Sequence, residues 1–148
     1  MEKITLDTIT SKNNQIIKDT KRLLTSSKLR RQQNAFVLEG ARLCFDVLNS
    51  VYKVKTLLFT EAIFYKYPEK VKQLSASYIA SYLITDDVAA KLGETSTSQG
   101  IFAVCEMSDL SKGICGDKII ALDNVQDPSN VGAIIRTAEA LGIDCIIA

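Results

Sequence analysis

The chain has 148 residues, of which 47% are hydrophobic and 24% are charged, as is typical of one ordinary globular domain or two small ones. Its longest run without a charged residue spans residues 73–85, whereas a membrane-spanning helix needs about 20 mostly apolar residues. The sequence therefore predicts no transmembrane segment. Met1 is followed by Glu2 and Lys3 rather than by the basic and then apolar stretch of a secretory signal, so we expect a cytoplasmic protein.

The chain contains no histidine. A Ser-His or Cys-His catalytic pair is therefore excluded, and the commonest zinc ligand is missing. The cysteines show no Cys-x-x-Cys spacing; they are Cys44, Cys105, Cys115 and Cys145. We therefore expect no metal site, and reduced, mostly buried thiols in a reducing compartment.

The formal net charge of +1 hides a division along the chain. Residues 1–76 carry 14 Lys/Arg against 7 Asp/Glu, whereas residues 77–148 carry 4 against 10. Within the basic half, residues 12–31 hold seven basic residues and one acid, Asp19. This density favours a polyanion such as RNA or DNA as partner. A solvated helix face followed by a basic loop explains the same charges equally well.

The predicted elements of residues 1–107 alternate between helices and strands. The first helix should start near Ser11 or Asn13, both good N-caps, and residues 28–34 should be a polar connection after it. Strands are predicted at residues 35–38, 54–59, 78–84 and 101–106, and helices at residues 41–51, 61–76 and 86–92. Pro68 should interrupt the helix over residues 61–76, because proline lacks the amide proton that a helix interior needs. The alternation predicts an α/β layer fold.

The remaining residues predict a second, shorter unit. Residues 108–117 have the composition of a linker, so residues 1–107 and 118–148 would form two domains. The predicted elements after the linker are a strand at 118–123, a loop at 124–130, a helix at 131–141 stopped by Gly142, and a strand at 143–148. Such a β-α-β unit normally forms a parallel strand pair. Because one helix cannot cover both faces of a parallel sheet, we expect an N-terminal fragment of a longer protein, or a sheet completed by a partner.

The most informative stretch is the loop before the last predicted helix, at the carboxyl end of a strand, where open α/β sheets bind ligands. Asn130 can cap that helix, and Gly132 allows close backbone approach by a ligand or another chain. Arg136 lies one turn further on the same face, from which it can reach a phosphate or a sugar hydroxyl. The alternative is a capped helix whose surface arginine pairs with Glu139, and spacing alone favours this alternative.

The pattern Asn130-x-Gly132-x-x-x-Arg136, preceded by Asp127-Pro128, resembles the first signature motif of the SpoU (TrmH) family of RNA methyltransferases, within the SPOUT superfamily. Several upstream segments resemble the substrate-binding domain that precedes the catalytic domain in many of these enzymes. These segments are Asn14-x-x-Ile17-Lys18, Lys28-x-Arg30-Arg31, residues 36–40 with Arg42, and Thr97-x-Gln99-Gly100-Ile101-x-Ala103-Val104.

The resemblance implies a two-domain enzyme that transfers a methyl group from S-adenosylmethionine to RNA, usually to a ribose 2′-hydroxyl of rRNA or tRNA. The first domain would be an α/β/α sandwich like that of kink-turn-binding ribosomal proteins. The second would be a parallel-sheet domain with a trefoil knot, which holds the cofactor and forms the homodimer. The family's later motifs, which bind S-adenosylmethionine, would lie beyond residue 148, so residues 1–148 should lack the cofactor site.

The resemblance also implies roles for individual residues. Asn130 and Arg136 would belong to the active site, within a motif loop that includes Asp127, Pro128 and Gly132. The residues expected to bind RNA are Lys12, Lys18, Lys28, Arg30, Arg31, Glu39, Arg42 and Gln99. Arg136 could remove the proton of the acceptor hydroxyl or position the acceptor phosphate; positioning is favoured because a guanidinium stays protonated at neutral pH.

Two other functions are consistent with parts of the sequence. A non-catalytic RNA-binding module would need only the basic first half of the chain. A nucleotide-binding β-α-β protein is disfavoured, because the loop has neither Gly-x-Gly-x-x-Gly nor a Walker lysine.

Overall fold

A computed structural model of the chain describes residues 6–76, 80–93, 98–107 and 116–147. Tyr78, Thr97, Cys115 and most of the expected linker, residues 108–115, lie outside these ranges. The chain divides into two compact units, Met1–Ser108 (unit 1) and Asp109–Ala148 (unit 2). In the described part of the chain, no helix has the length and apolar character needed to cross a membrane.

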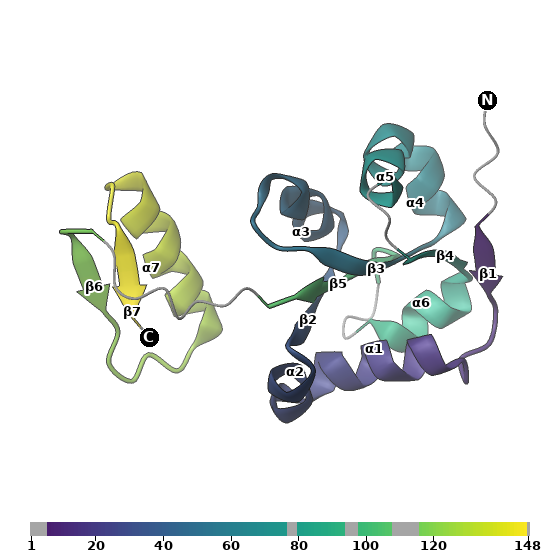
Figure 1. The fold of residues 1–148 in the computed structure, drawn as a ribbon, viewed down its shortest axis with the longest axis horizontal. Coiled ribbons are helices and arrows are strands. Elements are labelled where there is room, and N and C mark those ends of the chain that lie inside the picture. Colours follow the sequence, from purple (N-terminus) through teal and green to yellow (C-terminus); the bar gives the residue numbers. More distant parts are fainter. Residues whose placement is uncertain (1–5, 77–79, 94–97, 108–115, 148) are drawn as a thin grey trace. The chain divides into compact units, whose positions relative to one another are not determined.

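Unit 1 is built on a five-stranded sheet with the order β1-β4-β3-β5-β2 (Figure 1). The strands are β1 (Asp7–Ile9), β2 (Ala35–Glu39), β3 (Val54–Phe59), β4 (Ala80–Ile84) and β5 (Ile101–Glu106). β1, β4 and β3 are parallel, whereas β5 is antiparallel to both β3 and β2. The carboxyl ends of β1 to β4 and the start of β5 therefore share one edge of the sheet, which we call the strand-end edge.

Helices cover both faces of this sheet (Figure 1). One layer consists of α1 (Gln15–Thr25), α2 (Ser27–Gln33) and α6 (Asp86–Leu92). The other consists of α3 (Ala41–Asp46), the 3-10 turn η1 (Val47–Asn49), α4 (Glu61–Lys66) and α5 (Pro68–Ser75). This arrangement confirms the predicted α/β/α sandwich.

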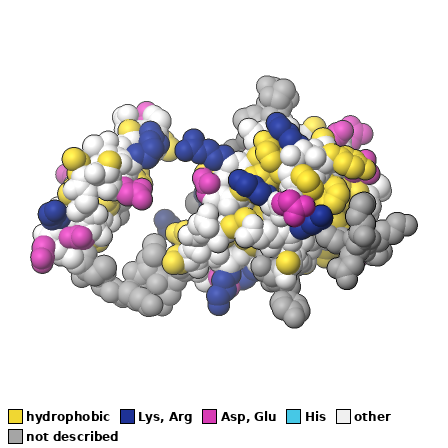
Figure 2. Space-filling model, turned by 90° about the horizontal axis from the view of Figure 1, so that it is seen from above, with side chains coloured by type: hydrophobic (Ala, Val, Ile, Leu, Met, Phe, Trp, Pro, Cys, Tyr) yellow, Lys and Arg dark blue, Asp and Glu magenta, His cyan; other side chains and the backbone are white. Residues whose placement is uncertain are grey.

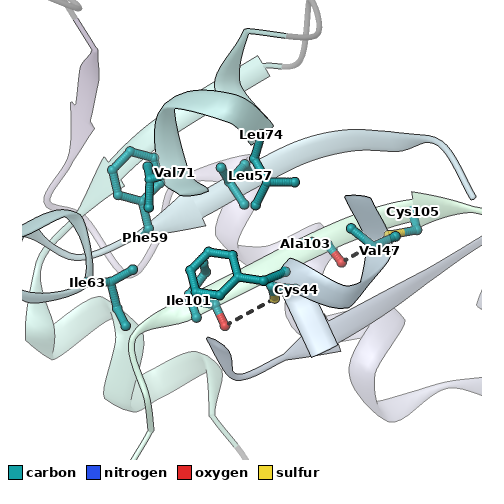
Figure 3. Packing of buried hydrophobic residues seen from close by; sticks show 11 residues of the cluster. Cys44, Val47, Leu57, Phe59, Ile63, Val71, Leu74, Ile101, Ala103 and Cys105 are labelled. Atoms are coloured by element: carbon teal, nitrogen blue, oxygen red, sulfur yellow. Dashed lines mark hydrogen bonds between the residues drawn. The ribbon is translucent and has the colours of Figure 1, made fainter. Parts of the chain in front are cut away.

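The hydrophobic core is centred on the two central strands, β3 and β5, whose side chains alternate between the two faces of the sheet. Leu57, Phe59, Ile101, Ala103 and Cys105 pack under α3, α4 and α5 (Figure 3). Leu58 and Phe102 point to the opposite face and pack under α1 and α6. β5 is buried from Ile101 to Cys105 and is a nearly continuous apolar run, whereas β3 is buried only from Leu57 to Phe59, after the exposed Lys55. The predicted bounds 54–59 and 101–106 coincide with the observed strands.

The two buried thiols of this core are poor nucleophiles. Burial, with a smaller contribution from neighbouring Cys105, raises the pKa of Cys44 to about 12, and burial raises the pKa of Cys105 to about 11. The Cys44 Sγ–H donates to the carbonyl oxygens of Leu38 at 3.5 Å and Ile101 at 3.9 Å. All three described cysteines are free, as expected, although Cys145 is half-buried rather than buried.

We therefore predict slow alkylation of a Cys115→Ser/Cys145→Ser variant by iodoacetamide at pH 8. At that pH a thiol with a pKa of about 12 is thiolate in only about one molecule in ten thousand, and thiolate is the reactive form. Mass spectrometry should show both thiols modified readily in guanidinium chloride and orders of magnitude more slowly in buffer. Equal rates under the two conditions would contradict burial of Cys44 and Cys105.

Two local predictions for unit 1 are wrong, one strand was missed and one prediction is confirmed. Residues 28–34 lie largely in helix α2 rather than in a polar connection, because Ser26 Oγ accepts from Leu29 N at 3.3 Å and Asn34 ends the helix in the left-handed region (φ 49°). The helix predicted over 41–51 ends at Asp46 and tightens into η1. The three-residue strand β1 was not predicted. The predicted break at Pro68 is confirmed, since α5 begins with this proline at a position that needs no amide donor.

Unit 2 is the predicted β-α-β unit, formed by β6 (Ile119–Ala121), α7 (Pro128–Ala140) and β7 (Cys145–Ile147). The two strands are parallel, as predicted. Asp144 Oδ2 accepts from the backbone N–H groups of Asp117 and Lys118, both at 3.0 Å, and so joins the starts of the two strands. Of the described residues of this unit only Ala138 is buried, whereas four large apolar side chains are exposed: Ile119, Ile135, Leu141 and Ile147.

Candidate functional site

The motif loop of unit 2 leads from the carboxyl end of β6 into α7. Asp127 is the N-cap of this helix: its Oδ1 accepts from the Ser129 backbone N–H and hydroxyl, both at 2.8 Å. These hydrogen bonds hold the pKa of Asp127 below its ordinary value. The prediction that Asn130 caps the helix is wrong, because Pro128 already occupies the first helical position, which suits its fixed φ angle. Asn130 lies within the first turn and is exposed.

Gly132 and Arg136 lie on one face of α7, as their spacing predicted. A Cβ atom added to Gly132 would lie 3.4 Å from Arg136 Nη1, so the guanidinium folds back over the glycine, towards the start of the helix. Among the ion pairs found in the described residues, none joins Arg136 to Glu139, the alternative partner. The arrangement places a cation near the helix N-terminus, at the edge of the sheet where the parallel strands end.

The strand-end edge of unit 1 brings together two segments that are distant in sequence. Gln99 Oε1 accepts from the backbone N–H of Ala41 at 2.9 Å and so caps the start of α3. Gly40, whose φ is +96°, makes room for this contact, since an added Cβ would lie 3.1 Å from Gln99 Oε1. The Gly40 N–H donates to the Ile101 carbonyl at 3.0 Å. Gln99 is therefore a positioning side chain for the turn that carries Arg42.

Glu39 and Arg42 lie beside this turn. The Glu39 carboxylate faces the residue that follows α6, because a Cβ on Gly93 would lie 3.0 Å from Glu39 Oε1 and 2.8 Å from Ser98 Cβ. Arg42 is exposed, and its Nε lies 3.9 Å from Asp46 Oδ2. An exposed pair at this distance holds the guanidinium only weakly, so Arg42 remains able to bind another anion.

The basic residues of α2 do not all behave alike. Lys28 and Arg31 are exposed. Arg30 instead donates from Nη1 to the carbonyl oxygens of Leu23 at 2.8 Å and Leu24 at 3.0 Å. These carbonyls end α1, so Arg30 has a structural role in joining α1 to α2. Substituting it would disturb the fold as well as any RNA contact.

Lys12 and Lys18 line a groove of about 440 Å³ along α1 and α6, which we call the α1–α6 groove. Its lining residues are Lys12, Gln15, Ile17, Lys18, Lys21, Arg22, Thr25 and Lys91. Lys21, Arg22 and Lys91 were not predicted as individual site residues. Lys21 and Arg22 could have been found from the charge density of residues 12–31, whereas Lys91 is brought there by the tertiary fold. No cluster of side chains suited to a metal ion occurs within the described ranges.

These features define a class of protein: an α/β/α unit with a basic surface, followed by a β-α-β unit with an arginine folded over the second turn of its helix. Residues 14–103 match the family described as the MRM3-like substrate binding domain, and residues 117–148 match the SpoU rRNA Methylase family. The chain belongs to the SpoU (TrmH) family, with an MRM3-like substrate-binding domain in its N-terminal part.

Named relatives and solved structures agree with this membership. The chain is 36% identical, over 94% of its length and 53% of the relative, to the 23S rRNA (guanosine(2553)-2′-O)-methyltransferase RlmP of Bacillus subtilis. The crystal structure of an rRNA methyltransferase from Sinorhizobium meliloti superimposes with a TM-score of 0.77 at 28% identity, over 95% of this chain and 54% of that one. Its AdoMet-bound form gives a TM-score of 0.76 at 30% identity, over 95% and 53%. The chain spans about half the length of these relatives.

Proposed function

We propose that the chain is the RNA-binding part and the first segment of the catalytic domain of an S-adenosylmethionine-dependent rRNA methyltransferase that modifies a ribose 2′-hydroxyl. The observation that carries the proposal is the loop and helix from Asp127 to Arg136, which lie within the residues matched to the SpoU family. RlmP of Bacillus subtilis, to which the chain is 36% identical over 94% of its length, is named for this reaction.

Residues of α7 act on the acceptor side of the reaction. The Arg136 guanidinium, held over Gly132, binds the phosphate next to the acceptor ribose through two parallel hydrogen bonds and stabilises negative charge that develops on the 2′-oxygen. Asp127 fixes the start of α7 through its hydrogen bonds with Ser129, and Asn130 shapes the first turn of the same helix. Positioning the acceptor in this way converts an encounter into an oriented reaction.

The methyl donor is S-adenosylmethionine, but the described residues do not fit it by themselves. A purine ring needs an enclosed, largely apolar slot. In the described part of unit 2 only Ala138 is buried, and the apolar side chains of Ile119, Ile135 and Leu141 are exposed. Further sheet, from the rest of the catalytic domain or from a second copy in a homodimer, would cover these side chains and complete the slot.

The RNA-binding surface proposed for unit 1 is its strand-end edge together with α2. Glu39, Arg42 and the turn fixed by Gln99 lie at that edge, and Lys28 and Arg31 are exposed on α2. Such cations bind phosphates and release counterions, which makes the affinity salt-dependent. Acting on rRNA, the enzyme would work in the cytoplasm.

The test is methylation of unmodified rRNA by the enzyme that contains this chain, with a tritiated methyl donor. We expect incorporation at one nucleotide, followed by resistance of the adjacent phosphodiester to alkaline hydrolysis, because a methylated 2′-oxygen cannot attack that phosphate. Incorporation that leaves the bond alkali-labile would indicate base methylation instead. RNA binding without any incorporation would support the non-catalytic RNA-binding module.

A further inference from the structure

Among the residues that the structure describes, the α1–α6 groove is lined by five cations and no acid. Lys12 precedes α1, Lys18, Lys21 and Arg22 are on α1, and Lys91 is on α6. Asp19, the one acid of residues 12–31, is not a lining residue, but its Oδ1 accepts a hydrogen bond from the lining Gln15 Nε2 at 2.8 Å, so it lies beside the groove. A groove lined by one sign of charge concentrates the electrostatic potential and attracts ions of opposite charge.

Three of these cations have no ion-pair partner among the described residues: Lys12, Lys18 and Lys91. All three are exposed. By contrast, Lys21 Nζ donates to the Leu92 carbonyl at 2.9 Å, which fixes its charge at the end of α6. Arg22 Nη1 lies 3.9 Å from Asp19 Oδ1, a distance that leaves most of its hydrogen-bonding capacity unused. The groove therefore combines one charge held by a hydrogen bond with three exposed charges that have no ion-pair partner among the described residues.

The groove adjoins the strand-end edge through three consecutive residues. Lys91 lines the groove, the carbonyl of Leu92 accepts from Lys21, and Gly93 packs against Glu39 and Ser98. Lys12 follows β1 and so belongs to the same edge. A ligand that occupies the edge can therefore extend into the groove without leaving unit 1.

The opposite helix layer has a different charge pattern. Figure 2, seen from the side of α3, α4 and α5, shows Lys and Arg side chains next to Asp and Glu side chains. Lys72 pairs with Glu69 at 3.2 Å, and Arg42 lies near Asp46. Lys66 and Lys70 lie over the rings of Tyr67 and Phe45. This layer therefore carries three lysines, Lys66, Lys70 and Lys72, as many as the unpaired lysines of the groove. Each of the three has an acidic or aromatic partner nearby.

We propose that the α1–α6 groove binds the sugar-phosphate backbone of the RNA substrate beyond the stretch held at the strand-end edge; this rests on the proposed function. Lys12, Lys18 and Lys91 bind phosphate oxygens. An anionic membrane is a poorer fit, because interfacial binding needs exposed apolar side chains. The one large apolar lining residue, Ile17, is only 2% exposed.

The experiment measures binding of a fluorescein-labelled RNA stem-loop as a function of salt. The groove variant is Lys12→Gln/Lys18→Gln/Lys91→Gln, and the matched control is Lys66→Gln/Lys70→Gln/Lys72→Gln, which removes the same charge from the opposite layer. We expect the groove variant to bind roughly ten-fold more weakly near 0.1 M salt, with a log-log salt slope smaller by about two units, while the control keeps the wild-type slope. Thermal unfolding checks that both variants fold.

The other outcomes separate the two proposals. A groove variant with the wild-type slope, alongside weaker binding by Arg42→Gln, would overturn the groove proposal and leave the proposed function intact. If the groove variant and the control lost RNA affinity equally, the loss would come from the change in net charge alone, and the groove would not be a binding site. Loss of binding to phosphatidylserine vesicles with RNA binding unchanged would assign the groove to a membrane. Absence of any RNA binding by the wild-type protein would overturn both proposals.

Discussion

Arg136→Lys is expected to lower the rate of methyl transfer by about 10²-fold or more in the enzyme that contains this chain. Lysine keeps the positive charge but replaces the planar fork by a single ammonium group, which cannot hold a phosphate through two parallel hydrogen bonds. The structure favours such a role, because the guanidinium folds over Gly132 rather than pairing with Glu139. Single-turnover methylation of a cognate rRNA fragment measures the effect, and S-adenosylmethionine affinity is measured in parallel.

Glu139→Gln is the matched control on the same helix. Because no ion pair joins Glu139 to Arg136 in the described structure, removing its charge should leave the rate unchanged. A rate unchanged in Arg136→Lys would show that Arg136 takes no part in methyl transfer. A loss of cofactor affinity equal to the loss of rate would place the arginine on the donor side instead of the acceptor side.

Each element that the sequence predicted correctly has one dominant physical signal in the sequence. β5 and the second half of β3 are buried on both faces, and there the sequence is continuously apolar, from Ile101 to Cys105 and from Leu57 to Phe59. Pro68 acts through its own covalent structure, and its effect does not depend on the surrounding fold. Alternation of strands and helices then leaves few arrangements other than layers.

Two of the wrong predictions, the connection at residues 28–34 and the cap of α7, concern elements held by polar contacts. Helix α2 has Leu29 as its one large apolar residue, so it shows no apolar periodicity and depends on Ser26, Asn34 and Arg30. At the start of α7 two good N-caps compete, and Asp127 wins over Asn130 because Pro128 follows it. Such choices depend on hydrogen-bond geometry more than on composition.

The residues of the candidate site also differ in how far they could be predicted from the sequence. Asn130, Gly132 and Arg136 are close in sequence, so a short sequence pattern was enough to predict that they lie on the same helix. The contact of Gln99 with the start of α3 and the position of Lys91 beside α1 exist only after the chain has folded. The motif was therefore visible in the sequence, whereas the assembled surface that we propose to bind RNA was not.

Gly100→Ala should destabilise unit 1 by about 2–4 kcal/mol, the sum of a backbone and a packing effect. Gly100 has φ +71°, a conformation that costs a residue with a side chain about 1–2 kcal/mol. An added Cβ would lie 2.6 Å from Oγ1 and 3.0 Å from Cγ2 of Thr60, which is buried. The backbone there cannot easily move away, because the Thr60 N–H donates to the Gly100 carbonyl at 2.9 Å.

Urea unfolding of four proteins separates the two effects: wild type, Gly100→Ala, Thr60→Ala and the double variant. If the steric conflict is with the Thr60 side chain, Gly100→Ala should cost only about 1–2 kcal/mol in the Thr60→Ala background, because the strain of the positive φ alone remains. The same cost in both backgrounds would show that Thr60 moves aside without penalty. Because Gly100 separates Gln99 from β5, the single variant should also weaken RNA binding below its unfolding transition, through the displaced start of α3.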